Sequence, residues 1–331
     1  MNLRNGIVFL LLLGLFLGRA EARDNRGVSR KFKAKKRIIH REINYTLKQN
    51  WLKLANTERG AVQALITLLE KSKTGKVLLR RAEKKAMKGG QQLLDVLLAG
   101  EGSLTDTTLI RKFYPSQPDN VIYESRSKVF INRRLNVKDA LLDMAHELTH
   151  FSYRMPFNPY QGPFDLKRFV TSTVEGKGGE VEAYLVECKV LFELIPSERE
   201  RDSNCLKVVE PTTGRLSKRR GVQQFYRVGR HSRHFRRNLT SFDLSLGDFP
   251  RLSSSDALFI SSAYGLPYPL AAIKEYKVIM GKACQNDHKR LGLLRQQLKV
   301  LQGTGRSPAR ENLYYNLSES YKTRCRNFPA S

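Results

Sequence analysis

Apolar residues in the first third of the chain recur every three or four positions. Val62, Leu65, Ile66, Leu68 and Leu69 form one such row, and Leu78, Leu79, Ala82 and Ala86 form another after a break at Thr74-Gly75. This spacing places the apolar side chains on one face of a helix. We therefore expect two or three packed helices over residues 44–98.

A β-rich region follows the first helices. Residues 120–124 and 128–132 are rich in Val, Ile, Tyr and Phe, and Ser125-Arg126-Ser127 separates them, which predicts a hairpin or two short strands. Beyond them, Val137, Leu141, Met144, Leu148 and Phe151 repeat at a spacing typical of helices. With Asn136 as a cap, they predict a helix that buries one face and leaves polar side chains on the other.

The remaining chain is again mostly helical in pattern. A helix is expected from Gly178-Gly179 through Cys188, ending before Pro196, and helical character returns at residues 270–280 and 289–301. Residues 201–256 are expected to be mostly loop. The predicted fold class is therefore α+β and predominantly helical, with a small β-hairpin or sheet beside the 137–151 helix.

The polar face of that helix contains His146-Glu147-Leu148-Thr149-His150. Residues four apart lie on one face of a helix, so both imidazoles can bind one metal ion while Glu147 lies beside them. A catalytic zinc site usually has a third protein ligand. Glu180, at the start of the next predicted helix, is the preferred candidate, and Glu182 and Glu175 are the alternatives.

With a downstream glutamate, the His-Glu-x-x-His pattern resembles the gluzincin class of zinc peptidases. The resemblance covers residues 120–195 roughly and implies a zincin-like catalytic core. It also implies a Zn²⁺ ion bound by His146, His150 and Glu180, with Glu147 as the general base that activates water for hydrolysis of a peptide or protein substrate. A strand beside the active helix pairs with extended substrates in such folds, and Lys128–Asn132 is the candidate for it.

The chain departs from the gluzincin pattern at one position. Tyr184 stands where the class usually has an aspartate. The carboxylate partner of a ligand histidine is therefore expected to be Asp143 or Glu187 instead. Four downstream residues are candidates for a second electrophile, each also compatible with a structural role: His231, His234, Tyr264 and Tyr268.

The N-terminus predicts export. A short basic start, an apolar run from Ile7 to Leu17 and Ala20-Glu21-Ala22 fit a signal peptide cut after Ala22. We expect a secreted or periplasmic protein divided into a signal peptide (1–22), a basic arm (23–41), a helical N-terminal region (42–119), the zincin-like core (120–200), and a basic loop with a helical C-terminal region packed on the core (201–331).

Four cysteines remain in the predicted mature chain. An even number in an exported protein suggests two disulfides. Of the three pairings, Cys188–Cys205 with Cys284–Cys325 is favoured because it closes the shorter loops.

The charge balance leaves a second function class open. The chain of 331 residues has 59 Lys and Arg against 31 Asp and Glu, a formal net charge of +28. Such a surface attracts anionic polymers or membrane surfaces, although a merely solvated surface has the same composition. Phe225, Tyr226 and Phe235 alternate with arginines and could stack on bases or sugars. The alternative to an enzyme is thus an exported binding protein for a cell-envelope polymer, an acidic glycan or nucleic acid. No nucleic-acid module is recognisable, and no specific nucleic acid is expected as a partner.

Overall fold

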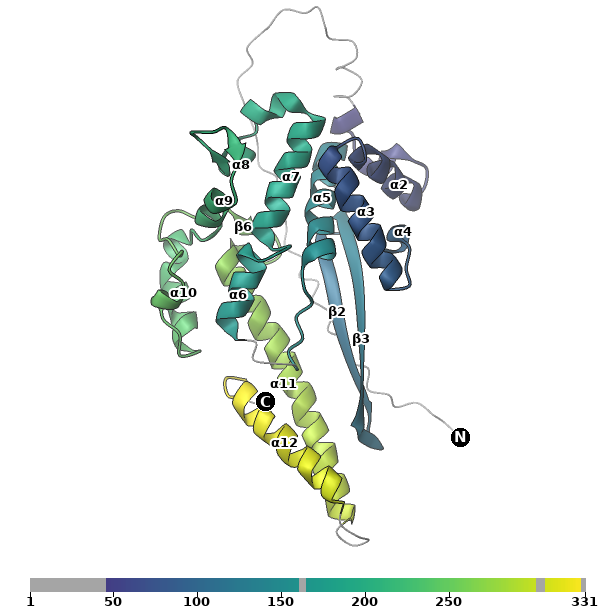
Figure 1. Ribbon diagram of the computed structural model, residues 1–331, viewed down its shortest axis with the longest axis vertical. Coiled ribbons are helices and arrows are strands. Elements are labelled where there is room, and N and C mark those ends of the chain that lie inside the picture. Colours follow the sequence, from purple (N-terminus) through teal and green to yellow (C-terminus); the bar gives the residue numbers. More distant parts are fainter. Residues whose placement is uncertain (1–45, 161–164, 302–306, 329–331) are drawn as a thin grey trace, which may run out of the picture.

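The computed structural model describes residues 46–160, 165–301 and 307–328. The fold is a mixed α+β fold, mostly helical, with one three-stranded sheet and two very small ones (Figure 1). This confirms the predicted fold class at that level. The predicted signal peptide (1–22) and basic arm (23–41) lie outside the described residues.

The first helices form where the apolar rows predict them. They are η1 (Trp51–Leu54), α2 (Glu58–Leu69), α3 (Lys73–Lys88) and α4 (Leu93–Val96). Thr57 and Ser72 cap α2 and α3 by accepting hydrogen bonds from Gly60 and Gly75. The predicted apolar rows of α2 and α3 are almost wholly buried in the main core.

The three-stranded sheet corrects two expectations. It contains β1 (Leu97–Gly100), β2 (Leu104–Tyr114) and β3 (Gln117–Asn132), so the helical N-terminal region predicted for 42–119 ends in strands. The hairpin turns after Tyr114, and residues 120–132 form one continuous strand rather than two. Ser125-Arg126-Ser127 contains no Gly, Pro or Asn and can stay extended in a twisted ribbon.

The position of β3 in the sheet argues against a third expectation. The strand order is β1-β3-β2, and Val129 and Phe130 pair with β1 on one side and with β2 on the other. Strands on both sides thus occupy the middle of Lys128–Asn132, so this segment is not an open edge for an extended substrate. Among the described strands of this sheet, β2 is the free edge next to the helix that carries the two histidines.

Helix α5 (Val137–Tyr153) carries the His-Glu-x-x-His sequence through the centre of the molecule (Figure 1). Asn136 caps it by accepting a hydrogen bond from Asp139, as predicted. All five residues of the predicted apolar stripe are buried. The opposite face is also covered, because α7 (Glu180–Leu194) packs along it and α2, α3, β2 and β3 surround the rest.

Part of the chain after α5 forms a second, smaller core, built mainly from α6 (Leu166–Glu175), α9 (Lys218–Phe225), α10 (Ser232–Thr240) and the C-terminal helices. The other elements between α7 and these helices are η2 (Pro196–Glu200), α8 (Ser203–Leu206), β4 (Val209–Glu210), β5 (Arg215–Leu216), η3 (Gly229–His231), η4 (Leu246–Asp248), β6 (Ile260–Ser261) and β7 (Leu266–Pro267). Of these, α8, β4 and β5 pack against the main core. Residues 201–256 thus contain several short helices that the sequence did not predict, and α9 and α10 are the longest of them. Their apolar positions are few because each helix buries only a narrow face.

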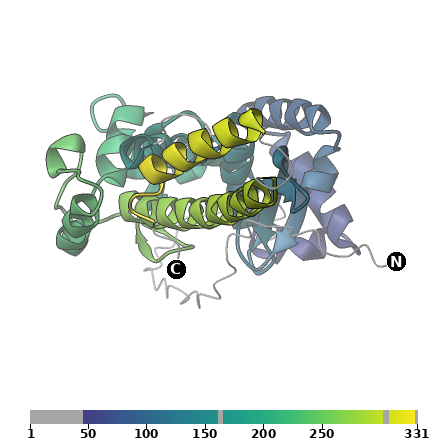
Figure 2. The ribbon, with the colours of Figure 1, turned by 90° about the horizontal axis from the view of Figure 1, so that it is seen from below.

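Two long helices end the chain. The two predicted helical segments in 270–301 are parts of one helix, α11 (Tyr268–Leu301), and α12 (Pro308–Arg324) packs beside it (Figure 2). Arg111 of β2 forms a buried ion pair with Asp287 of α11, and Arg324 of α12 binds the same carboxylate. We call these three residues the charge clamp. It fastens the β2–β3 hairpin to the C-terminal helices.

Both predicted disulfides are present, Cys188–Cys205 and Cys284–Cys325. Disulfides of this kind persist in oxidising compartments, which fits an extracellular setting. Among the described residues, no helix combines the length and apolar character needed to cross a membrane.

Candidate metal centre

Four side chains from two helices converge on one point between α5 and α7. His146, Glu147 and His150 lie on α5, and their potential ligand atoms are all within 4.8 Å of one another. Glu180 is the first residue of α7. The structure therefore brings together the two predicted histidines, the predicted base and the preferred third ligand.

Glu180 lies between the two imidazoles. Its Oε2 is 3.4 Å from Nε2 of His146, and its Oε1 is 3.5 Å from Nε2 of His150. Two ligand atoms on a tetrahedral zinc ion, each about 2.05 Å from the metal, are separated by about 3.3 Å. Both separations match that value closely, so the three side chains can share one ion after only small movements.

The other ring nitrogen of each histidine already has a partner. Nδ1 of His146 lies 3.1 Å from Oε2 of Glu187, and Nδ1 of His150 lies 2.8 Å from the carbonyl oxygen of Gly178. When Nδ1–H donates to these acceptors, Nε2 keeps its lone pair and faces the site. Both imidazoles are thus held in the tautomer and orientation that a metal ligand needs.

Glu187 is one of the two carboxylates that the sequence suggested as the partner of a candidate ligand histidine. It lies seven residues beyond Glu180 and so on the same face of α7. Of the two expected partners, Glu187 and not Asp143 contacts a ligand histidine. The buried hydroxyl of Tyr184 has no hydrogen-bond partner among the described residues. Asp143 lies nearby, and burial raises its pKa to about 7, although a hydrogen bond from Ser103 opposes the shift.

The charges at the centre match a site for a cation. Burial on its own would lower the pKa of His146, but hydrogen bonds to Glu180 and Glu187 outweigh it and hold that pKa well above its usual value. Burial likewise opposes ionisation of Glu180, yet the charge of His150 and hydrogen bonds from both histidines hold its pKa well below the usual range. A divalent ion would replace the proton of His146 as the partner of these carboxylates.

Glu147 has a different environment from the three candidate ligands. The hydroxyl of Thr105 on β2 lies 2.8 Å from both Oε2 and the backbone oxygen of Glu147. This contact ties the carboxylate to the edge strand and orients it beside the two histidines. Sequence reasoning missed Thr105, because it lies in a segment that was expected to be helical and no motif marks it.

The two alternative ligands are engaged elsewhere. Glu182 accepts a hydrogen bond of 2.6 Å from the backbone N–H of Gly178. It therefore supports the loop whose carbonyl holds His150, rather than facing the metal. Glu175 forms an ion pair with Arg251 and accepts a hydrogen bond of 3.0 Å from the hydroxyl of Tyr226, so it belongs to a different pocket.

Of the four candidate electrophiles, Tyr268 is the one whose pKa reflects the charges of the centre. Burial raises its pKa well above the usual value, and the negative charges of Glu180 and Glu147 raise it further. The phenol therefore stays protonated at neutral pH and can donate a hydrogen bond. His231 and His234 lie on η3 and α10, and Tyr264 lies under the ammonium group of Lys274.

A cleft leads away from the centre between β2 and α11. It has a volume of about 100 Å³, and His150 lies in its wall together with Thr105, Thr107 and Leu109 of β2. The opposite wall is one face of α11: Glu275, Val278, Ile279 and Lys282. Burial raises the pKa of Glu275, and the charge of Arg154 opposes the shift. Glu275 was not anticipated from the sequence, where nothing distinguishes it from other helix-surface carboxylates.

Gly178 is the glycine that the centre requires. Its φ is +67°, and a Cβ there would lie 2.4 Å from the backbone nitrogen of Arg154 and 2.7 Å from the carbonyl carbon of Tyr153. Gly178→Ala is therefore expected to lower the free energy of unfolding by about 2 kcal/mol or more. It should also weaken the binding of a divalent metal at the candidate centre about tenfold or more, because it displaces the partner of His150.

Urea unfolding and a competitive zinc titration measure these two effects. Gly214→Ala is the matched control, since Gly214 has a φ of +64° with nothing within 4 Å of the added Cβ. It should show only the smaller backbone cost, about 1 kcal/mol, with unchanged zinc affinity. Equal effects of the two variants would contradict the role assigned to Gly178.

Comparison of the chain with models of protein families, with curated proteins and with solved structures gives no match. The function is therefore argued from the geometry and chemistry of the centre.

Proposed function

We propose that the protein is a zinc metallopeptidase whose metal ion is bound by His146, His150 and Glu180. The observation that carries this proposal is the position of Glu180, whose two oxygens lie 3.4 and 3.5 Å from the two inward-facing Nε2 atoms. Two imidazoles and one carboxylate form a ligand set of catalytic zinc, which leaves one coordination position for water or substrate. A helix bearing HExxH, a second helix bearing glutamate and an adjoining edge strand also support a zincin-like core.

The choice of zinc follows from the donor atoms. Imidazole nitrogen suits zinc, copper, nickel and iron, whereas magnesium and calcium prefer sites built from oxygen alone. The ligand separations suit a tetrahedral ion with bonds of about 2 Å. Buried surroundings and Nδ1 partners on both histidines are features of resident metal sites.

Each remaining residue has a role that its position supports. A bound zinc ion would supply Lewis acidity that polarises the scissile carbonyl and lowers the pKa of a water molecule to about 7. Glu147 accepts the proton of the attacking water and delivers it to the leaving amine, while Thr105 keeps its carboxylate in place. Tyr268 is the candidate donor to the developing oxyanion, since its phenol stays protonated beside the centre.

The cleft indicates an extended peptide as the substrate. Its β2 wall is the edge of a sheet, whose unpaired backbone groups can hydrogen-bond to an added strand. Its α11 wall presents Val278 and Ile279 beside Leu109, while Lys85 and Arg154 also line it. The apolar residues among them, Leu109, Val278 and Ile279, fit apolar side chains of a substrate next to the scissile bond.

Metal analysis of the purified chain tests the proposal. We expect about one zinc per chain, and peptide hydrolysis that a chelator abolishes and added zinc restores. A mixture of peptides, analysed by mass spectrometry with and without chelator, provides the activity readout. A chain that binds no divalent metal with useful affinity, or that cleaves peptides equally well in chelator, would refute the proposal.

A further inference from the structure

One region of the surface has a charge that the proposed chemistry does not use. Residues 211–242 contain nine Lys or Arg and no Asp or Glu. They form β5, α9, η3 and α10, which lie on the opposite side of the molecule from α2 and α3 (Figures 1 and 2). The net positive charge per residue is therefore higher in this segment than the average for the chain.

Helix α10 presents a row of arginines outward. Phe235 and Leu239, four residues apart, are fully buried and hold the helix on the second core. Arg233, Arg236 and Arg237 are exposed on the other side and are neighbours at the three- and four-residue spacing of a helix. None of the ion pairs found between described residues involves these three arginines. Their charges are available to a ligand.

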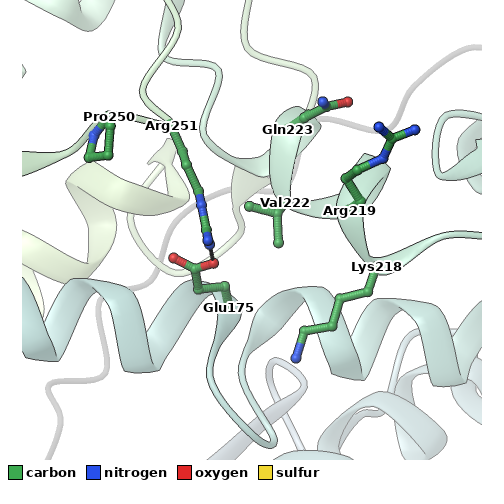
Figure 3. Close-up of a pocket in the computed structure, with 7 residues that line it drawn as sticks. All are labelled: Glu175, Lys218, Arg219, Val222, Gln223, Pro250 and Arg251. Atoms are coloured by element: carbon green, nitrogen blue, oxygen red, sulfur yellow. Dashed lines mark ion pairs between the residues drawn. The ribbon is translucent and has the colours of Figure 1, made fainter.

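A pocket with further cations lies beside α9. It has a volume of about 660 Å³ and is lined by Lys218, Arg219 and Arg251 together with a single acid, Glu175 (Figure 3). Arg251 pairs with Glu175, and Arg219 lies 3.2 Å from Glu210 at the pocket rim. Three cations and one acid leave the pocket lining positive.

Packing joins the pocket to α10. Phe249 stacks edge-on against Phe235 with ring centroids 5.4 Å apart, and Pro250 and Arg251 of the pocket follow Phe249 directly. We define the basic face as Lys218, Arg219, Arg251, Arg233, Arg236 and Arg237. The basic face thus has two parts. The pocket beside α9 can hold one anionic group, and the row of arginines on α10 can contact several further anionic groups.

The chemistry of the basic face selects the class of partner. Phe225, Tyr226 and Phe235, which the sequence offered for stacking on bases or sugars, are buried to 1%, 2% and 0% exposure. No ring of this trio is available to a base, so recognition depends on charge and not on stacking. Two disulfides fit an extracellular setting, where acidic polysaccharides are abundant polyanions. We propose that the basic face binds a linear acidic polysaccharide through its sulfate or carboxylate groups. This binding is independent of the metal centre.

Paired charge-neutralising variants test the inference. R233Q/R236Q/R237Q removes three charges from the basic face, and K76Q/R80Q/K84Q removes three exposed charges from α3 on the other side of the molecule. The probe is a fluorescein-labelled heparin oligosaccharide, followed by fluorescence anisotropy over a range of salt concentrations. We expect the first variant to lose affinity about tenfold or more and to show a shallower salt dependence, while the α3 control changes less than about twofold.

Two further measurements make the result decisive. K218Q/R219Q should also weaken heparin binding, and circular dichroism should show that each variant keeps the wild-type fold. Equal losses in the α10 and α3 variants would overturn the inference, because binding would then follow net charge alone. Tighter binding of a single-stranded oligonucleotide or of phosphatidylserine vesicles than of heparin, through the same arginines, would also overturn the assignment of the partner.

Discussion

Glu147→Gln is expected to keep zinc bound and to lower kcat for peptide hydrolysis by about 10³-fold. Glutamine is isosteric with glutamate and can still accept the hydrogen bond from Thr105, which lies 2.8 Å from Oε2. The three candidate ligands remain in place, so metal affinity should not change. The substituted amide cannot accept a proton, which removes the base from the reaction. Metal analysis and steady-state kinetics on the same preparation measure both effects.

Thr105→Val provides the companion experiment. It removes the hydroxyl that orients Glu147 and leaves the carboxylate itself, so activity should fall by a smaller factor, about tenfold. If Glu147→Gln matched the wild type on every peptide cleaved, Glu147 would not be the base, whatever the metal content.

Glu180→Gln is expected to have the largest effect on metal binding. In the proposed site the carboxylate would supply the third ligand and the negative charge between the two imidazoles, and an amide supplies neither well. Loss of an outer partner costs about 10–100-fold in affinity, and we expect removal of a ligand to exceed that range. Competition with a chromophoric chelator gives the dissociation constant.

Glu182→Gln is the matched control for this experiment. Glu182 lies two residues further along the same helix, and a glutamine oxygen can still accept the hydrogen bond from Gly178. Zinc affinity should remain within about threefold of the wild type. Zinc loss in Glu182→Gln with retention in Glu180→Gln would exchange the roles of the two residues and contradict the ligand set proposed here.

The sequence predicted the parts of the site that lie on regular helices. His146, His150 and the flanking apolar stripe follow from helix periodicity, and Glu180 was preferred over Glu182 from its motif and its place at a helix start. Helix periodicity does not show which other segments pack around these residues, because that depends on the tertiary fold. Helix α5 is covered on all sides, whereas its pattern predicted only one buried face, with polar side chains on the other.

The parts that could not be predicted depend on contacts between distant segments. The carbonyl of Gly178 that holds His150, and the hydroxyl of Thr105 that holds Glu147, come from backbone paths that no local pattern encodes. Thr105 became available only because residues 97–119 form strands. The Thr, Asp, Arg and Lys residues of β2 give this segment a polar composition that resembles that of a surface helix or loop, although most of the strand is buried or half-buried. Both disulfides were predicted correctly, since loop length alone separated the three pairings.

The charge clamp has a consequence for how substrates fit. Thr105, Thr107 and Leu109 line the cleft from every second position of β2, and Arg111 is the next residue in that alternation. On the opposite wall, Asp287 follows Lys282 along α11. The ion pair between Arg111 and Asp287 thus links β2 and α11, the two walls of the cleft, just beyond its end. Arg324 of α12 adds a second ion pair to the same carboxylate. The width of the cleft and the proposed zinc centre therefore depend on separate sets of residues. Under the proposed function, selectivity for peptides could then change in evolution without altering the metal site.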